Sequence, residues 1–187
     1  MAESSSEFQP YLDLLGDLGR LGASMDRLHA QHLSCRQGCS GCCHQHLGVF
    51  RVEATAVSRA LAELPADTRQ HIHQQAREVL DGTRSACPLL LDESCSIYAS
   101  RPVICRTHGY PLHYQEEEGE IILDVCPLNF TQPGSLEALE LNQTLPLDRL
   151  NLRLAAINYV YCRDQLADPG LAEDRLPLAE VVLEPQA

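Results

Sequence analysis

The apolar positions near the start of the chain repeat with the spacing of an α-helix. From Pro10 onward they step by four and three residues, which places them on one face of a helix. Gly16, Gly19 and Gly22 fall on another stripe, where glycine weakens the helix but lets a neighbouring segment come close. The sequence therefore predicts a first helix, whose apolar face is formed by Leu14, Leu18, Leu21, Met25 and Leu28.

The middle of the chain predicts two helices, an irregular stretch and a hairpin. The helices cover residues 53–64 and 65–82, and the second begins at a proline and ends near a glycine. Residues 86–109 are short, irregular segments that contain three cysteines. The run YPLHYQEEEGEIILDVC, residues 110–126, has two apolar or alternating stretches joined by a charged turn around Gly119, which predicts a β-hairpin.

The last part of the chain predicts one more helix and then a tail. Apolar residues from Leu147 to Tyr161 recur at helical spacing. From residue 168 onward, prolines and acidic residues are frequent, and we expect this segment to lie over the surface. The expected organisation is a disordered N-terminus over residues 1–9, a single domain over 10–166 and an acidic, proline-containing tail over 167–187.

Composition narrows the class of protein. A chain of 187 residues that is 44% hydrophobic can form one domain with its own core. Its 14 basic against 26 acidic residues give a net charge of −12, which argues against a nucleic acid or an anionic membrane as the partner. We see no secretory signal and no membrane-spanning run. We therefore expect a cytoplasmic protein, in which structural disulfides are rare.

Nine cysteines in such a chain point to metal rather than to disulfides. The run CRQGCSGCC at residues 35–43 holds four of them, and as a helix it would place all four on one stripe. One helix face cannot surround an ion, and Gly38 and Gly41 indicate that part of the run is a loop. The remaining ligands must come from elsewhere in the chain. The run contributes Cys35, Cys39, Cys42 and Cys43.

Four later cysteines supply the missing ligands, namely Cys87, Cys95, Cys105 and Cys126. Two of them precede proline, as ligand cysteines do in bacterial ferredoxins. Eight thiols would fit two tetrahedral zinc sites, or one four-iron cluster with thiols to spare. The adjacent pair in the first run is expected to have diverging side chains that serve different centres or different sides of one. Cys162 belongs to the last predicted helix and is expected to pack in the core.

Two arginines flank the seventh cysteine of the chain. Arg101 and Arg106 would offset the negative charge of a thiolate site and so assist in binding the cofactor. An ordinary structural ion pair is the other interpretation of Arg101. Histidines 44, 46 and 108 lie near cysteines but are not needed as ligands when eight thiols are present, and His71 and His73 are expected to face solvent.

The cysteine pattern resembles a known family. The segments CRQGCSGCC, CPLL at 87–90, CSIYASRPVICR at 95–106 and CPLN at 126–129 are similar to the YkgJ-type cysteine-cluster family, the C-x-x-C-x-x-C-C class of zinc- or iron-chelating domains. The matching segments span roughly residues 35–130. This chain departs from the pattern in having three residues, rather than two, between Cys35 and Cys39.

The resemblance implies that the cysteines hold metal. A flagellin lysine methylase that contains the same domain resembles an iron–sulfur protein, so the resemblance favours an iron–sulfur cluster, of the [4Fe-4S] type, over zinc. No reaction transfers with the pattern. The expected fold is mainly α with a small β-hairpin, built around an irregular, cysteine-lined metal-binding centre.

Three functions remain open at this point. The leading one is a cytosolic protein that holds an iron–sulfur cluster for electron transfer, redox sensing or an accessory role, with a protein redox or modification partner. The second is a structural or storage zinc protein with one or two four-cysteine sites. The third is a cluster-dependent modification enzyme or its accessory subunit. Thiolates bind both zinc and iron tetrahedrally, so the sequence leaves both metals open.

Overall fold

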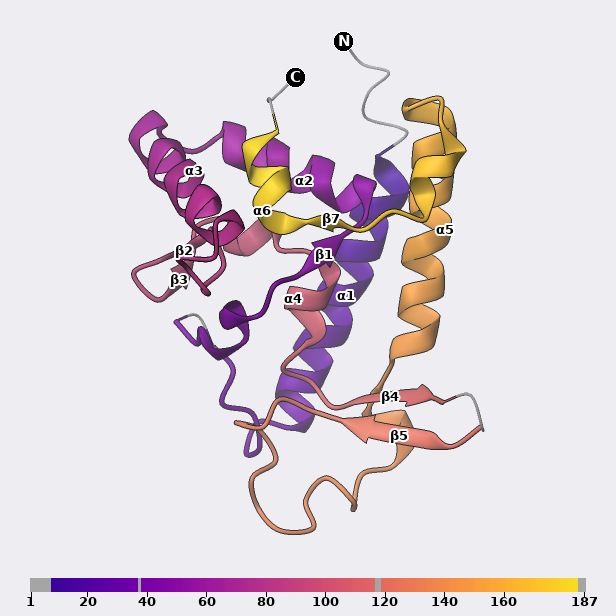
Figure 1. The fold of residues 1–187 in the computed structure, drawn as a ribbon. Helices are drawn as coiled ribbons and strands as arrows, with labels where there is room; N and C mark the ends of the chain where they lie inside the picture. Colours follow the sequence, from indigo (N-terminus) through magenta and orange to yellow (C-terminus); the bar gives the residue numbers. More distant parts are fainter. Residues whose placement is uncertain (1–7, 37, 117–118, 185–187) are drawn as a thin grey trace. The chain divides into compact units, whose positions relative to one another are not determined.

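The structure, a computed structural model, describes residues 8–36, 38–116 and 119–184. In this part of the chain helices dominate, and the small sheets have two or three strands (Figure 1), which confirms the expected fold class. The chain forms two compact units, each assembled from two separate stretches. Unit 1 contains residues up to Arg36 together with Val103–Ile157, and unit 2 contains Gln37–Pro102 and Asn158–Ala187.

Unit 1 begins with the first predicted helix. α1 (Gln9–Leu28) buries Leu14, Leu18 and Met25 of the expected apolar stripe. The prediction of disorder over residues 1–9 is wrong at its end, because Phe8 is buried and its ring packs against another aromatic ring of α1. An aromatic residue next to the first turn fixes the start of the helix by burying its own side chain. Residues 1–7 lie outside the described part of the chain.

The predicted hairpin is the centre of the unit 1 sheet. β4 (Leu112–Gln115) pairs antiparallel with β5 (Ile121–Asp124), and parallel with β6 (Leu145–Pro146), giving the order β5-β4-β6. Residues 117–118 of the turn are not described. The hairpin prediction is confirmed. The core beside this sheet contains Met25, Leu112 and Leu145, with Leu21, Tyr110, Leu147 and Leu150 packed around them.

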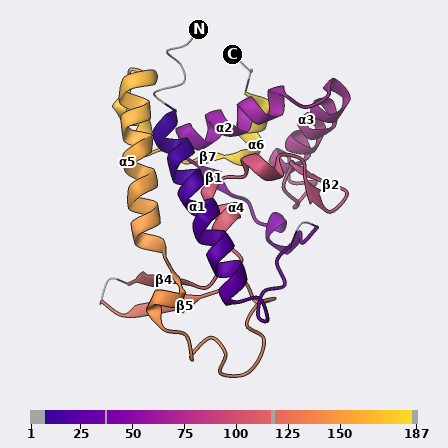
Figure 2. The ribbon, with the colours of Figure 1, turned by 180° about the vertical axis from the view of Figure 1, so that it is seen from behind.

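One of the three helix glycines makes a close approach. α1 lies beside the short helix α4 (Val103–Thr107), as the view from behind shows (Figure 2). A Cβ atom on Gly22 would come within 3.0 Å of the Tyr110 hydroxyl, which donates a hydrogen bond to Asp26 at 2.9 Å. A hydroxyl that tight against the helix leaves no room for a larger residue. Gly19, by contrast, has open space around it.

Unit 2 is built mainly from three helices. α2 (Arg51–Ala62) and α3 (Ala66–Leu80) match the two helices predicted in the middle of the chain, and both pack against α6 (Leu178–Leu183). Their shared core is wholly apolar. It contains Val49, Ala54, Val57, Leu61, Ile72, Ala76, Leu89, Ile97, Leu178, Ala179, Val181 and Val182.

The prediction of a surface tail over residues 167–187 is wrong for residues 176–183, and residues 185–187 lie outside the described part of the chain. After the 3₁₀ turn η5 (Pro169–Ala172), the strand β7 (Leu176–Pro177) pairs antiparallel with β1 (Gly48–Val49). α6 follows immediately and buries most of its six residues in the unit 2 core. A helix that short and buried on most sides shows no amphipathic period, so the periodicity could not reveal it.

A tight hairpin in unit 2 carries one of the cysteines. β2 (Leu90–Leu91) and β3 (Ser94–Cys95) are joined by a two-residue turn at Asp92 and Glu93. Both turn residues have a positive φ, 45° and 59°, as the turns of two-residue hairpins require. The β2–β3 hairpin therefore reverses the direction of the chain within six residues. The short helix η3 (Tyr98–Ser100) follows it.

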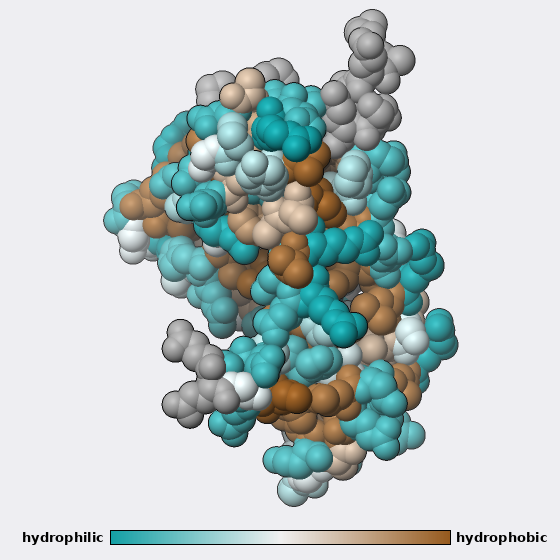
Figure 3. All heavy atoms as spheres, turned by 90° about the vertical axis from the view of Figure 1, so that its right-hand side faces the viewer, coloured by the Kyte–Doolittle hydropathy of each residue, from teal (hydrophilic) through white to brown (hydrophobic). Residues whose placement is uncertain are grey.

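The last predicted helix is the longest element after α1. α5 (Leu147–Gln165) belongs to unit 1 as far as Ile157 and to unit 2 from Asn158. Several of its hydrophobic side chains, such as Leu152 and Tyr159, are exposed, and Figure 3 shows hydrophobic residues among hydrophilic ones on the face where α5 lies. Among the described residues, no helix is long and apolar enough to cross a membrane.

A fully buried amide fixes the start of α2. The Asn158 side chain is 0% exposed, its Oδ1 accepts from the Val52 backbone N–H at 3.1 Å, and its Nδ2 donates to the Ala172 carbonyl at 3.0 Å. Cys162 packs beside it, fully buried, which confirms the expectation that this cysteine belongs to the core. One side chain thus satisfies backbone groups in two segments, α2 and η5, that are far apart in the sequence.

We expect Asn158→Ala to destabilise the protein by about 2 kcal/mol, because it leaves a buried donor and a buried acceptor unpaired. Urea unfolding followed by circular dichroism measures this. Asn151→Ala, an exposed position on the same helix, is the matched control and should change the free energy of unfolding by less than about 0.5 kcal/mol. Equal effects of the two substitutions would contradict the role of Asn158.

Candidate metal centre

The adjacent cysteines lie in a single turn of 3₁₀ helix. This turn is η2 (Gly41–His44). At its start, the Cys43 N–H donates a hydrogen bond to the Ser40 carbonyl at 2.9 Å. The expectation that the two side chains diverge is wrong, because the Cys42 and Cys43 side chains are hydrogen-bonded to each other. The tighter winding of a 3₁₀ turn brings successive side chains nearer than an extended chain would.

A third cysteine is tied directly to this turn. The Cys87 N–H donates to the Cys43 carbonyl at 2.6 Å, although the two residues are far apart in the sequence. The Cys87 carbonyl in turn accepts from Leu90, which pairs with Cys95 across the β2–β3 hairpin. The irregular segment after α3 and the β2–β3 hairpin that follows it therefore carry Cys87 and Cys95 to the same part of unit 2 as the η2 turn.

The pKa shifts of these thiols show how close they are. Desolvation by burial raises the pKa of Cys87 to about 11, with charge on Cys95 and Cys42 raising it further. Burial also raises the pKa of Cys95, and again Cys42 adds to the effect. The hydrogen bond with Cys43 is the largest of the causes that raise the pKa of Cys42. Unit 2 thus brings Cys42 close enough to Cys43, Cys87 and Cys95 for these thiols to influence one another.

Arg101 supplies positive charge to this group. Its charge lowers the pKa of both Cys42 and Cys95, against the effects that raise them. The guanidinium lies 3.6 Å above the centre of the Tyr98 ring, and its Nε donates to the Tyr98 carbonyl at 3.0 Å. These contacts hold the cation in place beside the thiols. The placement agrees with the expected charge compensation, while a role in binding a cofactor stays a prediction.

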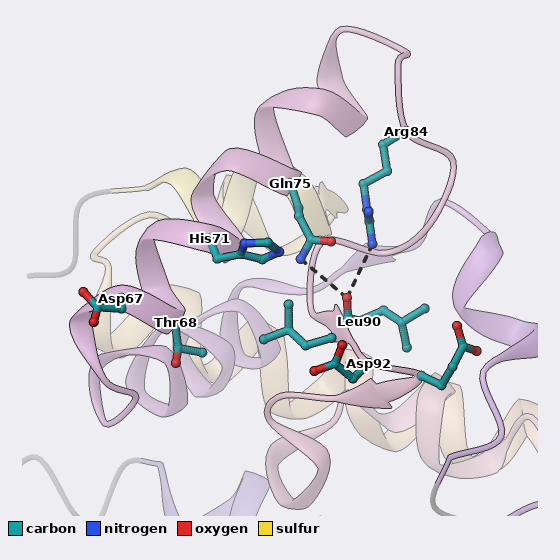
Figure 4. A pocket seen from close by; sticks show the side chains of 9 residues that line it. Asp67, Thr68, His71, Gln75, Arg84, Leu90 and Asp92 are labelled. Atoms are coloured by element: carbon teal, nitrogen blue, oxygen red, sulfur yellow. Dashed lines mark hydrogen bonds between the residues drawn. The ribbon is translucent and has the colours of Figure 1, made fainter.

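The segment after Cys87 is fixed by side chains of α3 and of the loop that follows it. The buried Gln75 donates to the carbonyls of Pro88 and Leu90, and Arg84 donates to Leu90 and to Ala86 (Figure 4). These bonds replace the ladder that an irregular segment lacks. They hold the path of the chain between two of the four thiols.

Two cavities adjoin this region. The larger, about 610 Å³, lies between α3 and the β2–β3 hairpin and is lined by polar residues that include Asp67, His71 and Asp92 (Figure 4). It has no cysteine in its lining. The smaller, about 170 Å³, is lined by Cys87 and His46 together with apolar residues of α3 and α6. His71 is exposed as expected, whereas His73 is half-buried and its Nε2 has no hydrogen-bond partner among the described residues.

The fifth predicted ligand of unit 2, Cys39, differs from the other four in the contacts it makes. Cys39 is half-buried and follows Gly38, whose φ is +89°. Its neighbour Ser40 donates a hydrogen bond to Glu93 in the hairpin turn, which ties this stretch to β2–β3. No described contact joins the Cys39 thiol to the other four, so its role as a ligand remains a prediction.

Unit 1 contains the other three predicted ligands, and one of the two arginines. Cys35 follows α1 and is exposed, Cys105 lies half-buried in α4 next to Arg106, and Cys126 is buried after β5. The Cys35 Sγ accepts a hydrogen bond from the Asn129 side chain at 3.3 Å. The eight cysteines predicted as ligands are therefore divided between the two units, five in unit 2 and three in unit 1.

Two residues of this region were missed by the sequence reasoning. Asn129 is the last residue of the CPLN segment, where only the cysteine was assigned a role. Gly109 lies so close to Cys35 that a Cβ atom there would be 2.5 Å from its Sγ. A buried amide and a glycine at a close approach have no signal in spacing, although the place of Asn129 in the CPLN segment beside Cys126 could have indicated it.

The donor set fits a thiophilic metal. All nine cysteines are free, so no disulfide competes for them. Within the described residues, no three Cys, His, Asp or Glu side chains are already oriented as the ligands of one ion. Four neighbouring thiols with a cation beside them are nevertheless the chemistry that zinc or iron–sulfur sites require. Binding would require the side chains to reorient, since a metal replaces their protons and their mutual hydrogen bond.

The comparison with family models gives one match. The family is described as "CxxCxxCC: Putative zinc- or iron-chelating domain", and the match covers residues 34–127, half of the chain. It begins just before Cys35 and ends just after Cys126, so it contains all eight predicted ligands and both arginines. No curated protein and no solved structure matches the chain. The resemblance seen in the sequence is confirmed: the chain belongs to the CxxCxxCC family of zinc- or iron-chelating domains.

Proposed function

We propose that this protein holds an iron–sulfur cluster, of the [4Fe-4S] type, through its clustered cysteines. Metal binding by the cysteines follows from the family, and the coupled group of Cys42, Cys43, Cys87 and Cys95 carries the proposal further. Four thiols are the number that such a cluster takes from a protein. Cys39, Cys35, Cys105 and Cys126 are the further ligands predicted from the sequence.

An electron-transfer, redox-sensing or accessory role fits this site. When bound, the cluster would supply one-electron redox chemistry. The four neighbouring thiols of unit 2, Cys42, Cys43, Cys87 and Cys95, are half-buried, so a protein redox or modification partner could come near them. Arg101 offsets their negative charge, and the apolar residues around Cys87 limit contact with water. Nine free cysteines also suit a reducing compartment, which supports a cytoplasmic location.

Zinc is the alternative that the structure favours next. Four thiols in one neighbourhood equal the ligand count of a structural zinc site. Such a site would contribute folding free energy directly, because the ion binds only the folded arrangement. A cluster-dependent modification enzyme is the third candidate, favoured by the cavity that Cys87 and His46 line, since a small molecule could reach the site there.

Elemental analysis of protein purified without oxygen tests the proposal. We expect roughly four irons and four sulfides per bound cluster, with a broad visible absorption that bleaches on reduction. The aerobically purified protein serves as the comparison, because exposure to oxygen removes iron and admits zinc. Stoichiometric zinc without iron or sulfide in the anaerobic sample would overturn the iron–sulfur assignment and support the zinc protein.

We expect Cys87→Ala to lose most of the bound metal, because it removes a ligand from the group of four thiols. Metal content per chain after desalting measures this. Cys162→Ala is the matched control: it also removes a thiol from unit 2, but one that is fully buried beside Asn158, and it should keep the wild-type metal content. Equal retention by both variants would exclude Cys87 as a ligand.

We expect Arg101→Gln to weaken metal binding about tenfold, the lower end of the usual cost of losing a group that supports the ligands. A centre of four thiolates is negatively charged, and the substitution removes the cation that offsets it. Chelator competition measures the affinity. Arg163→Gln, an exposed arginine of the same unit, controls for loss of a surface charge. If Arg101→Gln binds metal with unchanged affinity, the charge of Arg101 does not contribute to metal binding.

A further inference from the structure

A buried amide in unit 1 joins the three segments that carry its cysteines. Asn129 is only 3% exposed. Its Nδ2 donates to the Cys35 Sγ at 3.3 Å and to the Gly109 carbonyl at 2.6 Å, and its Oδ1 accepts from the Ser34 N–H at 2.7 Å. Its own backbone N–H donates to the Cys126 carbonyl at 2.8 Å.

Each of these contacts reaches a different part of the chain. The Ser34–Cys35 segment follows α1 and brings the first cysteine. Gly109 closes the segment that begins with Cys105 in α4. Asn129 itself follows Cys126 after β5. One side chain therefore holds together the three short segments that contain the three predicted ligands of unit 1.

The chemistry of an amide suits a ligand thiolate. A primary amide offers two N–H donors and a carbonyl acceptor, and Asn129 uses all three. A donor directed at a cysteine sulfur favours its charged form, which is the form that binds metal. Hydrogen bonds of this kind orient metal ligands and set their basicity. The interaction at Cys35 is thus of the type found around metal centres, rather than a contact between apolar groups.

Gly109 makes the close approach of the thiol feasible. A Cβ atom at this position would lie 2.5 Å from the Cys35 Sγ, a distance that real side chains do not adopt, and 3.1 Å from its Cβ, which is unusually tight. The sulfur therefore lies directly against the backbone, where the Asn129 amide reaches both the sulfur and the Gly109 carbonyl. Any larger residue would displace the sulfur from its donor.

The neighbouring residue shows that the position of Asn129 is held firmly. Phe130 has a φ of +50°, a conformation that costs energy for a bulky residue. Its ring is stacked on His32 at 4.9 Å and meets His29 edge-on at 5.2 Å, and its N–H donates to the His32 carbonyl. These contacts compensate for the strain. They keep the turn of residues 128–130 alongside residues 32–34.

We propose that Asn129 is the positioning residue for metal binding in unit 1: it holds the Cys35 sulfur and keeps the segments of Cys105 and Cys126, the other predicted ligands of the unit, beside it. Among the described residues these three thiols are not yet grouped around one point, so binding would bring them together. This inference rests on the proposed metal-binding function and extends it, because it assigns ligands outside the four thiols of unit 2. Asn129 does not bind the metal. It fixes the Cys35 sulfur and holds the three ligand segments together.

The test measures which thiols a metal protects. The zinc-loaded full-length chain and the chelated chain are alkylated, and each cysteine is quantified by peptide mass spectrometry. In the wild type, zinc should protect Cys35, Cys105 and Cys126 with one common concentration dependence. If Cys35 reacts equally with and without zinc, it is not a ligand and the proposal is wrong.

Asn129→Asp then tests the positioning role. It keeps the size of the side chain but replaces both donors, and we expect zinc protection of the three unit 1 thiols to require 10–100-fold more zinc. The unit 2 thiols should stay protected as in the wild type, which a general loss of folding would not allow. Asn151→Asp on the exposed face of α5 is the matched control for the added charge. Unchanged protection at Cys35 in Asn129→Asp would overturn the proposal.

Gly109→Ala disturbs the same contact from the other side, with Gly19→Ala as its control, since a Cβ at Gly19 meets nothing within 4 Å. If Asn129→Asp fails to fold, Gly109→Ala should still show the selective loss of zinc protection at Cys35. Wild-type protection at Cys35 in Gly109→Ala would also count against the proposal.

Iron and sulfide analysis of the wild type tests the proposed function separately. A zinc-only wild type whose unit 1 thiols depend on Asn129 would reject the iron–sulfur assignment while upholding this inference.

Discussion

The structure depends above all on the cost of bringing several thiols close together. When one of them ionises, its charge raises the pKa of its neighbours, as Cys42 does for Cys87 and Cys95. These neighbouring thiols are therefore stable when they keep their protons, or when a bound cation takes the place of the protons. Arg101 provides part of that compensation, and a bound metal would provide the rest. Binding of metal and the local arrangement of the thiols are coupled for this reason.

Both units hold their cysteine segments by the same means. Short irregular segments cannot satisfy their backbone groups by themselves, so buried side chains do it for them. In unit 2 the amide of Gln75 bonds the carbonyls that follow Cys87, and in unit 1 the amide of Asn129 bonds the segments around Cys35 and Gly109. An amide is suited to this task because it donates and accepts at once. The regular helices serve mainly as the frame on which these residues are placed.

The sequence predicted the longer elements well and the short ones poorly. α1, α2, α3, α5 and the β4–β5 hairpin have periodic apolar positions, and periodicity follows directly from which face is buried. α6 was assigned to a surface tail, because six residues buried on most sides show no period. The same reason explains Phe8, whose burial depends on packing against α1 and not on any local pattern.

The sequence by itself determined the chemistry of the protein. The number, spacing and setting of its cysteines indicated metal binding and the family, because clustered thiols at such spacings are typical of metal ligands. Only the tertiary structure decided which thiols are neighbours. It paired Cys42 with Cys43, joined them to Cys87 and Cys95, and set the amide of Asn129 on a sulfur 94 residues away in the chain. Contacts across such separations arise from the packing of whole segments, which local spacing does not encode.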